Sequence, residues 1–304
     1  MRTHPLLGLA ALVLGTTGCL FPYPPEGNHF GDGPLPPGPS CYDRLERYDG
    51  DKAAHGCGAD ATAQLASLPA DLQRLVLCDS KLASLTGITR LGSLRELVLY
   101  RMKELPSLDA LGRAVSLSKL DLTGAAGASY DFLAGLGRLQ ALVLRDTKLA
   151  DAAPLAGLRD LVELDLSHTA VADLSPLARL GALRVLRLSG TPVKALGPLA
   201  GLASLEELEL DGTKVEDLSP LGSLVRLRLL GIEGTQVRDL RPLHGLKNLR
   251  SVGALGAPVN DEQRFALEKA VNATRSEDDH LVVNSAGARS ENPYCPIDRW
   301  REKN

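Results

Sequence analysis

Residues 205–226 read LEELELDGTKVEDLSPLGSLVR, and this unit decides the fold. Leu208 and Leu210 alternate with acidic residues, which is the period-two pattern of a short strand with one buried face. In the Leu-Ser-Pro-Leu stretch 218–221, Ser219 offers an N-cap oxygen and the proline suits the first helical position. The unit therefore predicts a strand, a turn and a short helical or 3₁₀ segment.

The same unit recurs in register along residues 72–259. Each step is 22 residues, apart from one step of 23 between the second and third units. A single unit cannot bury both its strand leucines and its helix leucines, whereas stacked units can, so the chain is expected to form a solenoid. The strands should form a parallel sheet on a concave face, with nine strands spanning about 40 Å at about 4.8 Å each. The opening leucines are Leu72, Leu94, Leu117, Leu139, Leu161, Leu183, Leu205, Leu227 and Leu249.

This pattern resembles the leucine-rich repeat family, and the Leu-Ser-Pro-Leu version is most similar to the internalin-type bacterial repeats. The resemblance covers residues 72–259 and implies an α/β horseshoe that holds protein partners on its concave strands. One departure is systematic, because the family usually places asparagine at the ninth position of each unit. A threonine hydroxyl can bond backbone groups locally, so the middle units should keep a weaker version of that turn. The ninth positions here are Ser80, Met102, Ala125, Thr147, Thr169, Thr191, Thr213, Thr235 and Ala257.

The amino-acid composition limits the kinds of ligand that the protein is expected to bind. The net charge is −3, and lysine and arginine are scattered along the chain, which argues against a nucleic-acid surface. Aromatic residues make up 4% of the chain, too few to build a stacking platform for bases or sugars. We expect a protein partner and a monomeric chain, with no nucleic acid, small-molecule substrate, cofactor or metal.

Residues 1–19 indicate an export signal. Arg2 supplies a positive charge, and the apolar run 6–14 is too short to span a bilayer. The end of this segment, residues 16–19, resembles the lipobox of bacterial lipoproteins, which would make Cys19 the lipidated first residue. Leu20 follows the cysteine, and by the same resemblance this favours an outer-membrane lipoprotein facing the periplasm or the cell surface. The alternative is an ordinary cleaved signal and a secreted protein.

The next segments should space and cap the solenoid. Residues 20–40 are rich in proline and glycine and indicate a tether, with a proline-rich docking motif as the less favoured alternative. Residues 41–71 should form the N-terminal cap.

A Cys41–Cys57 disulfide would staple this cap in an oxidising compartment. Cys78 competes for Cys57, and Cys295 lies beyond the far end of the repeats. Zinc binding near His55 is disfavoured because no Cys-x-x-Cys pair supports it.

Residues 260–304 should form the C-terminal cap and tail. The stretch 260–263, Asn-Asp-Glu-Gln, indicates a capping box. Phe265, Leu267 and Val271 follow at helical spacing and should cover the last repeat. Residues 281–283 could add one further strand.

Positions three, five and seven of each unit should point out of the concave face. On this basis Asp165, Arg187 and Glu209 are expected to form an ion ladder across three units. A patch of neighbouring acids and an irregular region in the second and third units are the two candidate binding places, and Gly212 and Gly234 should leave room beside the acids. Whether the irregular region is a site or a decayed repeat stays open. The candidate ligand-binding residues are Tyr100, Arg101, Arg145, Glu207, Glu209, Asp211 and Glu233.

The sequence raises three possible functions. The favoured one is a membrane-tethered scaffold that grips another protein on its concave face. The alternative is a structural or adhesive envelope lipoprotein without a discrete ligand. An enzyme is disfavoured, with no catalytic residue assigned, because His168 and His244 are isolated and the paired acids project from an open face without a pocket to shift their pKa values.

Overall fold

The computed structural model describes residues 46–48, 52–57, 62–78, 82–102, 105, 107–127, 129–273 and 281–284. Residues 40–304 belong to one compact unit of the chain. The expectations for the leader 1–19 with Cys19, for the tether 20–40 and for Cys41 lie outside the described residues and stay predictions.

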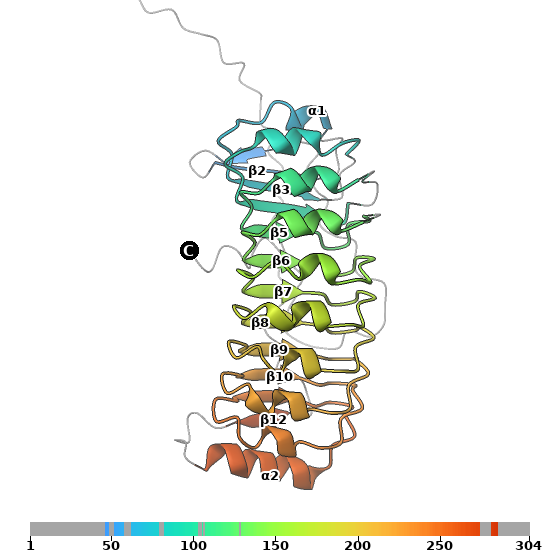
Figure 1. The fold of residues 1–304 in the computed structure, drawn as a ribbon, viewed down its shortest axis with the longest axis vertical. Helices are drawn as coiled ribbons and strands as arrows, with labels where there is room; N and C mark the ends of the chain where they lie inside the picture. Colours follow the sequence, from blue (N-terminus) through green and yellow to red (C-terminus); the bar gives the residue numbers. More distant parts are fainter. Residues whose placement is uncertain are drawn as a thin grey trace, which may run out of the picture. The chain divides into compact units, whose positions relative to one another are not determined.

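A single sheet of twelve strands runs through the described part of the chain, in sequence order from β1 to β12 (Figure 1). β1 pairs with β2 in antiparallel fashion, and every later pair is parallel. The nine repeat units supply β3 to β11, one strand each, as expected. The strands are β1 Glu46–Tyr48, β2 Ala53–Cys57, β3 Arg74–Cys78, β4 Glu96–Tyr100, β5 Lys119–Asp121, β6 Ala141–Val143, β7 Glu163–Asp165, β8 Val185–Arg187, β9 Glu207–Glu209, β10 Leu229–Gly231, β11 Ser251–Gly253 and β12 Val282–Asn284.

Short helices form a second layer parallel to the sheet (Figure 1). The segments between consecutive repeat strands are 3₁₀ helices, and α-helices stand at the two ends of the stack. The helices are α1 Thr62–Leu65, η1 Thr86–Arg90, η2 Asp109–Arg113, η3 Asp131–Gly135, η4 Ala153–Leu155, η5 Ser175–Arg179, η6 Gly197–Leu199, η7 Ser219–Ser223, η8 Arg241–Leu243 and α2 Asp261–Asn272. Among the described residues, no helix has the length and apolar character needed to cross a membrane.

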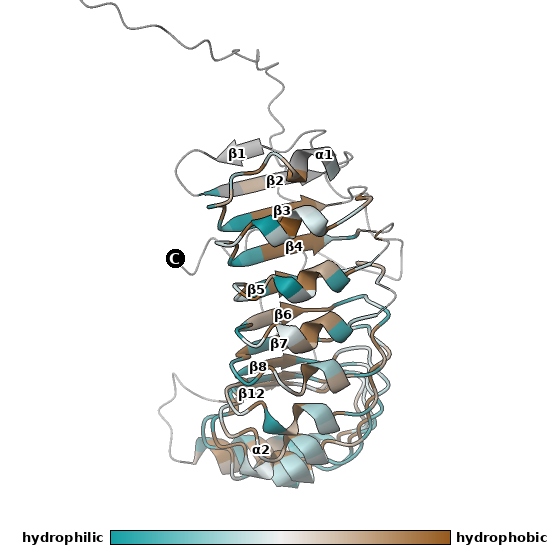
Figure 2. Cartoon of the chain, turned by 45° about the horizontal axis from the view of Figure 1, so that its top comes forward, coloured by the Kyte–Doolittle hydropathy of each residue, from teal (hydrophilic) through white to brown (hydrophobic). Residues whose placement is uncertain are grey.

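The core fills the space between the strands and the 3₁₀ helices. The fourth and sixth positions of the units, such as Leu208 and Leu210, point inward and are at most 2% exposed. The opening leucines are buried as well, and so are the helix leucines such as Leu221. In Figure 2, β3 and β4 are mostly brown with teal amino ends, consistent with apolar strands that begin at a charged residue. Apolar burial of this kind is the main stabilising contribution to the stack.

The ninth-position threonines act within their own turns. Each hydroxyl donates to the backbone carbonyl three residues earlier at 2.6–2.7 Å, as Thr213 does to Leu210. All five threonines are buried, so the bond satisfies a polar group that would otherwise be costly to bury. The expectation of a local backbone bond is confirmed for these middle units.

The eighth position of the units adopts a left-handed backbone. Gly212 and Gly234 have φ of 68° and 62°, and the non-glycine residues Arg101, Asp146 and His168 have φ of 54–57°. L-residues adopt this conformation at a cost of about 1–2 kcal/mol, which explains glycine in the later units. Because Arg101, Asp146 and His168 form the same turn without glycine, the expectation that Gly212 and Gly234 leave room beside the acids stays a prediction.

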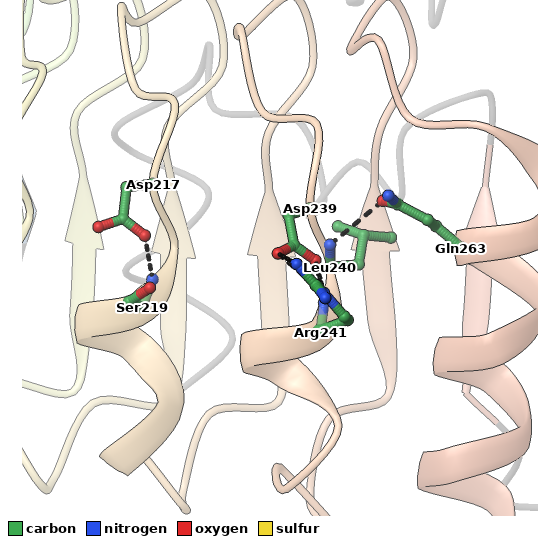
Figure 3. A network of polar contacts seen from close by, with 6 residues as sticks. All are labelled: Asp217, Ser219, Asp239, Leu240, Arg241 and Gln263. Atoms are coloured by element: carbon green, nitrogen blue, oxygen red, sulfur yellow. Dashed lines mark hydrogen bonds and ion pairs between the residues drawn. The ribbon is translucent and has the colours of Figure 1, made fainter.

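The 3₁₀ helices are capped by a residue that the sequence pattern did not single out. Ser219 is the first residue of η7 and makes no N-cap bond, so its predicted role was wrong. Instead, the Asp217 carboxylate accepts the Ser219 N–H at 2.8 Å, and Asp239 accepts the Arg241 N–H at 2.9 Å (Figure 3). The guanidinium of Arg241 also bonds Asp239, and these contacts lower the pKa of Asp239 to about 2. Side-chain oxygens of this kind commonly close a turn onto the backbone two residues ahead.

The C-terminal helix α2 closes the far end of the stack. Asn260 caps it by accepting the Gln263 N–H at 2.9 Å, which confirms the capping residue. The Gln263 side chain in turn accepts the backbone N–H of Leu240, next to η8 (Figure 3). Leu267 and Val271 are fully buried, whereas Phe265 is 68% exposed. The prediction that Phe265 faces the core was wrong, because Phe265 lies two residues before the buried Leu267 and therefore about 200° around the helix from it.

The remaining cap expectations have mixed outcomes. The further strand predicted at residues 281–283 exists as β12. At the other end, Cys78 is buried and disulfide-bonded, and the backbone of Cys57 lies opposite Cys78 in the β2–β3 register. The side chains of Cys57 and His55, and residues 41 and 295, lie outside the described residues. The Cys41–Cys57 pairing therefore stays a prediction, with Cys78 as the competing partner of Cys57.

Candidate functional site

The candidate site is the outward side of the sheet, called here the concave face and made of positions three, five and seven of the units. The strand register aligns these positions as expected, so that Asp165, Arg187 and Glu209 are neighbours in one row. Neighbours in a row are about 4.8 Å apart, close enough for their side chains to interact. The chemistry of the face can therefore be followed row by row.

Charges alternate at the start of the position-three row. Arg74 Nε lies 2.6 Å from Glu96 Oε2, and Lys119 Nζ lies 3.3 Å from Glu96 Oε1. An alternating ladder of ion pairs is therefore present over β3, β4 and β5. Because these side chains are part-exposed, the ladder adds little to the free energy of unfolding and mainly keeps the face polar.

Arg187 is the centre of the face. It is 3% exposed, and its guanidinium lies 2.8 Å from Glu163, 3.0 Å from Glu209 and 3.8 Å from Glu207. Burial alone would lower its pKa, but Glu209, Glu163 and Asp165 outweigh that effect and raise the pKa. The guanidinium is therefore a fixed positive charge under the acids around it.

The predicted ladder of Asp165, Arg187 and Glu209 is present with Glu163 in place of Asp165. The carboxylate of Asp165 accepts the backbone N–H of Ser167 at 2.9 Å, within its own strand end. Arg187 instead bonds Glu163, which lies diagonally across from it at position three. The ion cluster therefore runs from Glu163 through Arg187 to Glu209.

The acidic patch, defined as Glu207, Glu209, Asp211 and Glu233, covers β9, β10 and the turns after them. The side chains of Glu207 and Glu209 are 35% and 29% exposed. The structure thus brings together these four predicted residues on one part of the face. It also places Arg187 beneath both Glu207 and Glu209. Of these two acids, the sequence argument had paired only Glu209 with Arg187.

The carboxylate of Asp211 occupies space that is free because residue 231 on the neighbouring strand is a glycine. Its carboxylate accepts the Glu233 N–H of the next unit at 2.7 Å. It also leans over Gly231, where a Cβ atom would lie 2.7 Å from Asp211 Oδ1. Gly231, at position five, is therefore the glycine that makes room for the acid, and the sequence argument missed it.

This placement changes the acidity of Asp211. Burial, together with the nearby Glu233 and Glu209, raises its pKa to about 6, although the hydrogen bond from the Glu233 backbone opposes the shift. A carboxyl group with a raised pKa gains from a nearby positive charge, since that charge favours the ionised form. Asp211 is thus the member of the patch most responsive to a basic partner.

The three other predicted residues lie on earlier units. Tyr100 ends β4 and is part-exposed, and Arg101 takes up the left-handed turn conformation next to it. Arg145, at position seven of the fourth unit, lies 3.3 Å from Asp146. Three strand spacings, about 14 Å, separate β6 from β9, so these residues and the acidic patch form two regions of one face.

The irregular region extends to a shallow hollow away from positions three, five and seven. The turn after β5 keeps the Tyr130 hydroxyl bonded to the Ala125 carbonyl at 3.2 Å. An open depression of about 370 Å³ lies beside it, with Asp131, Lys148 and Pro154 in its lining. Tyr130 is buried, so the irregular turn has a packed structure of its own.

The described residues show neither a metal cluster nor a grouping with catalytic geometry. His168 is exposed in a turn, and His244 follows η8. Within the part of the chain that the structure covers, no three His, Cys, Asp or Glu side chains converge on a possible metal position.

A stack of parallel strands with 3₁₀ helices behind it, and rows of side chains on an open sheet, defines a leucine-rich repeat solenoid. Comparison with solved structures agrees. Internalin C2 from Listeria monocytogenes is 34% identical, with a TM-score of 0.53 over 55% of this chain and 74% of that one. The leucine-rich repeat protein LIC12759 of Leptospira interrogans is 23% identical, with a TM-score of 0.65 over 74% of this chain and 58% of that one.

A plant peptide hormone receptor, RGFR1, solved in complex with RGF2, is 19% identical, with a TM-score of 0.57 over 70% of this chain and 35% of that one. No protein-family model and no curated protein matches the chain. The likeness to internalin C2 nevertheless identifies the chain, which belongs to the leucine-rich repeat family and carries internalin-like repeats.

Proposed function

We propose that this protein is an exported scaffold, tethered to a membrane, that binds another protein on its concave face. The observation that carries the proposal is the acidic patch on an open sheet, where four carboxylates from two neighbouring units stand on one rigid surface. A repeat sheet can hold a large partner without a deep pocket, because many strands contribute side chains to one surface. The partner surface should be basic where it meets this patch.

Two features support a partner of this kind. Among the described residues at positions three, five and seven of the fifth to eighth units, six are acidic and one, Arg187, is basic, which gives a formal charge of −5. Burial and like charges raise the pKa of Asp211 to about 6, so a basic partner would relieve an unfavourable charge there. The receptor RGFR1, which resembles this fold, was solved with the peptide RGF2 bound.

The first prediction concerns this patch. Reversing the charges with Asp211→Lys and Glu233→Lys should lower the affinity for a partner isolated by pull-down about tenfold or more, because attraction becomes repulsion. Affinity should fall with added salt, which screens the charges. It should also rise from about pH 5 to about pH 7, since Asp211 with its raised pKa of about 6 becomes ionised over that range. Titration of the purified partner by calorimetry measures all three effects.

The matched control uses two charged residues outside the concave strands. Glu216 and Arg238 are exposed in the segments between the strands and the 3₁₀ helices. Reversing both should leave the affinity unchanged. Equal losses from the two pairs of substitutions would show that the acidic patch is not the binding surface.

The tether is proposed from the sequence of residues 1–40. A lipid on Cys19 would anchor the chain through its acyl groups, which contribute about 0.8 kcal/mol per buried CH₂. The proline-rich segment 20–40 would then hold the repeats away from the bilayer. An outer-membrane location fits Leu20 after the cysteine, and secretion without a lipid is the alternative.

The second prediction tests this anchor. Replacing Cys19 with serine removes the thiol that would carry the lipid, so radiolabelled palmitate should no longer enter the protein. The variant should also move from the membrane fraction to the soluble fraction after cell breakage. The same change at Cys78, which is disulfide-bonded, should leave labelling intact. A Cys19→Ser chain that stays in the membrane fraction would rule out lipid anchoring.

A further inference from the structure

Basic residues that are scattered in the sequence meet along one edge of the stack. Because the repeat strands are all parallel, the loops that lead from each 3₁₀ helix into the next strand lie on the same side (Figure 1). Backbone bonds join these loops in series at position two, where the Arg228 N–H donates to the Glu206 carbonyl and the Arg250 N–H donates to the Arg228 carbonyl. The basic edge is defined as the eight loops 89–95, 112–118, 134–140, 156–162, 178–184, 200–206, 222–228 and 244–250.

The basic edge carries a strong positive charge. It holds eleven arginine or lysine residues, all exposed, and two acids, Asp160 and Glu206, which gives a formal charge of +9 in a chain whose net charge is −3. On the opposite edge, the loops of the fourth to eighth units hold five basic and eight acidic residues. Those loops are 145–151, 167–173, 189–195, 211–217 and 233–239. The 22-residue spacing therefore gathers on one edge the positive charges that the sequence argument treated as scattered.

Little of this charge is neutralised within the described part of the chain. Arg184 pairs with Glu206 at 2.8 Å, and this bond, with the attraction of nearby arginines such as Arg226, lowers the pKa of Glu206. One acid thus serves several arginines. Among the described residues, none forms an ion pair with Arg113 or Arg138. A row of like charges repels itself, so an anionic surface placed against this edge would be attracted by the whole row.

Two apolar side chains project from the same edge. Val115 and Val225 are 57% and 56% exposed, and they are two of the four large apolar residues that are exposed in the described part of the chain. Both occupy the same place in their loops, three residues before position two. Exposed apolar side chains among basic ones are typical of surfaces that bind a membrane, where the cations meet the headgroups and the apolar groups enter the acyl boundary.

The eight loops lack the groups that bind nucleic-acid bases. They contain no phenylalanine, tyrosine or tryptophan, the side chains on which unpaired bases usually stack. Arginine forks bind the oxygens of a phosphate group, which phospholipid headgroups also present. With Val115 and Val225 beside them, these arginines fit a layer of phosphate headgroups over hydrocarbon better than they fit a nucleic acid.

The acidic patch does not oppose such a contact. Asp211 and Glu233 occupy position seven, which lies five residues beyond position two, about 16 Å along the strand. At physiological ionic strength charges are screened over about 8 Å. An anionic surface at the basic edge would therefore be attracted by the nearby arginines and hardly repelled by the distant acids.

We propose that the basic edge docks against the anionic phospholipid headgroups of a membrane, so that the strands point away from the bilayer. The proposal rests on the membrane tether of the proposed function and adds the orientation of the stack. The 21 residues of the tether 20–40 reach at most about 70 Å, which limits how far the stack can move from the membrane. In the docked orientation the acidic patch stands at the outer ends of the strands, where a protein partner can reach it.

Flotation with vesicles tests the docking. The full chain carrying Cys19→Ser, which lacks the thiol for the proposed lipid, is mixed with vesicles of phosphatidylcholine alone or with about one third phosphatidylglycerol. The affinity should be about tenfold or more higher for the anionic vesicles, and added salt should lower it. Equal affinity for the two kinds of vesicle would overturn the proposal.

Charge reversals locate the docking edge. Arg113→Glu, Arg138→Glu and Arg226→Glu together should lower the affinity for anionic vesicles about tenfold or more. The matched control reverses three exposed basic residues on the opposite edge, which changes the net charge equally and should leave the affinity unchanged. The control substitutions are Lys194→Glu, Lys214→Glu and Arg238→Glu. Circular dichroism confirms that both variants are folded. Equal losses in the two variants would show that net charge and not this edge attracts the vesicles, against the proposal.

The exposed valines distinguish a membrane from another polyanion. Val115→Ser with Val225→Ser should lower the affinity for anionic vesicles about threefold or more, because two apolar groups no longer enter the bilayer. The same variant should bind a single-stranded oligonucleotide as weakly as the parent chain does. An oligonucleotide that binds the parent more tightly than the anionic vesicles do, with no contribution from the valines, would assign the edge to nucleic acid and overturn the proposal.

The outcomes also separate this proposal from the proposed tether. If palmitate labels Cys19 but the variant with reversed charges on the basic edge binds vesicles as the parent does, the docking proposal fails and the tether remains. If the Cys19→Ser chain binds anionic vesicles through the basic edge while no lipid enters the parent at Cys19, the tether fails and the docking surface remains.

Discussion

Replacing Leu186 with alanine should lower the free energy of unfolding by about 2–5 kcal/mol. The side chain is fully buried, and its strand neighbours Leu164 and Leu208 stand directly opposite it in the register. The deletion therefore leaves a cavity between coils that the fixed strand spacing cannot close. Urea unfolding followed by circular dichroism measures the change. Leu208→Ala should behave in the same way, because it occupies the same position one unit later.

The damage should also be local. Each unit contacts mainly its neighbours, so amide protection should fall most in the fifth to seventh units and remain near the ends. Val185→Ala is the matched control, since Val185 belongs to the same strand but lies part-exposed on the concave face. Its cost should be well under half that of Leu186→Ala. Equal costs for Val185 and Leu186 would contradict the assignment of inward and outward positions.

The repeat core could be predicted because one physical requirement recurs in every unit. Leu208 and Leu210 alternate with polar residues, and apolar residues at the same two positions of all nine units leave one consistent register. The strand β12 and the Asn260 cap were predictable for a related reason, since each depends on a few adjacent residues. An ambiguous residue in one unit is resolved by the equivalent residues of the other units. The fold was therefore easier to predict than the site, which has no such copies.

The capping of the 3₁₀ helices was missed although a signal was present. Asp217 and Asp239 each stand two residues before a helix, and Asp151 and Asp173 do so in earlier units, with bonds of 2.8–2.9 Å. The Ser-Pro pair drew the assignment to serine, because that pair is a strong N-terminal signal in α-helices. In these short 3₁₀ turns the serine is already inside the helix, so the acceptor must lie further back along the chain.

The details of the concave face depended on side-chain directions that spacing does not determine. The row argument paired Arg187 with Asp165, but a long side chain also reaches diagonal neighbours, and Glu163 is within its range. Gly231 was overlooked for a similar reason: its role is set by the Asp211 carboxylate of the adjacent strand, which leans over it. The residue types in a row predict the net charge of a face better than they predict which side chains pair with one another.

Arg187→Met should be the most damaging change on the concave face. Methionine keeps much of the apolar volume but removes the buried charge, which leaves Glu163, Glu207 and Glu209 repelling one another around an apolar side chain. Removing one partner of a buried ion pair costs about 3–5 kcal/mol, and the part-exposed acids place this case at about 3 kcal/mol. Thermal and urea unfolding of the purified variant measure the loss.

Two comparisons show whether the charge cluster is the cause. Arg184 belongs to the same unit and makes two bonds to Glu206, but its side chain is 55% exposed. Arg184→Met should therefore have a much smaller effect than Arg187→Met, because solvent screens an exposed pair. Adding Glu163→Gln and Glu209→Gln to Arg187→Met should recover most of the loss, since the repelling charges are then gone. If the triple variant is as unstable as Arg187→Met alone, repulsion between Glu163 and Glu209 is not the cause of the loss.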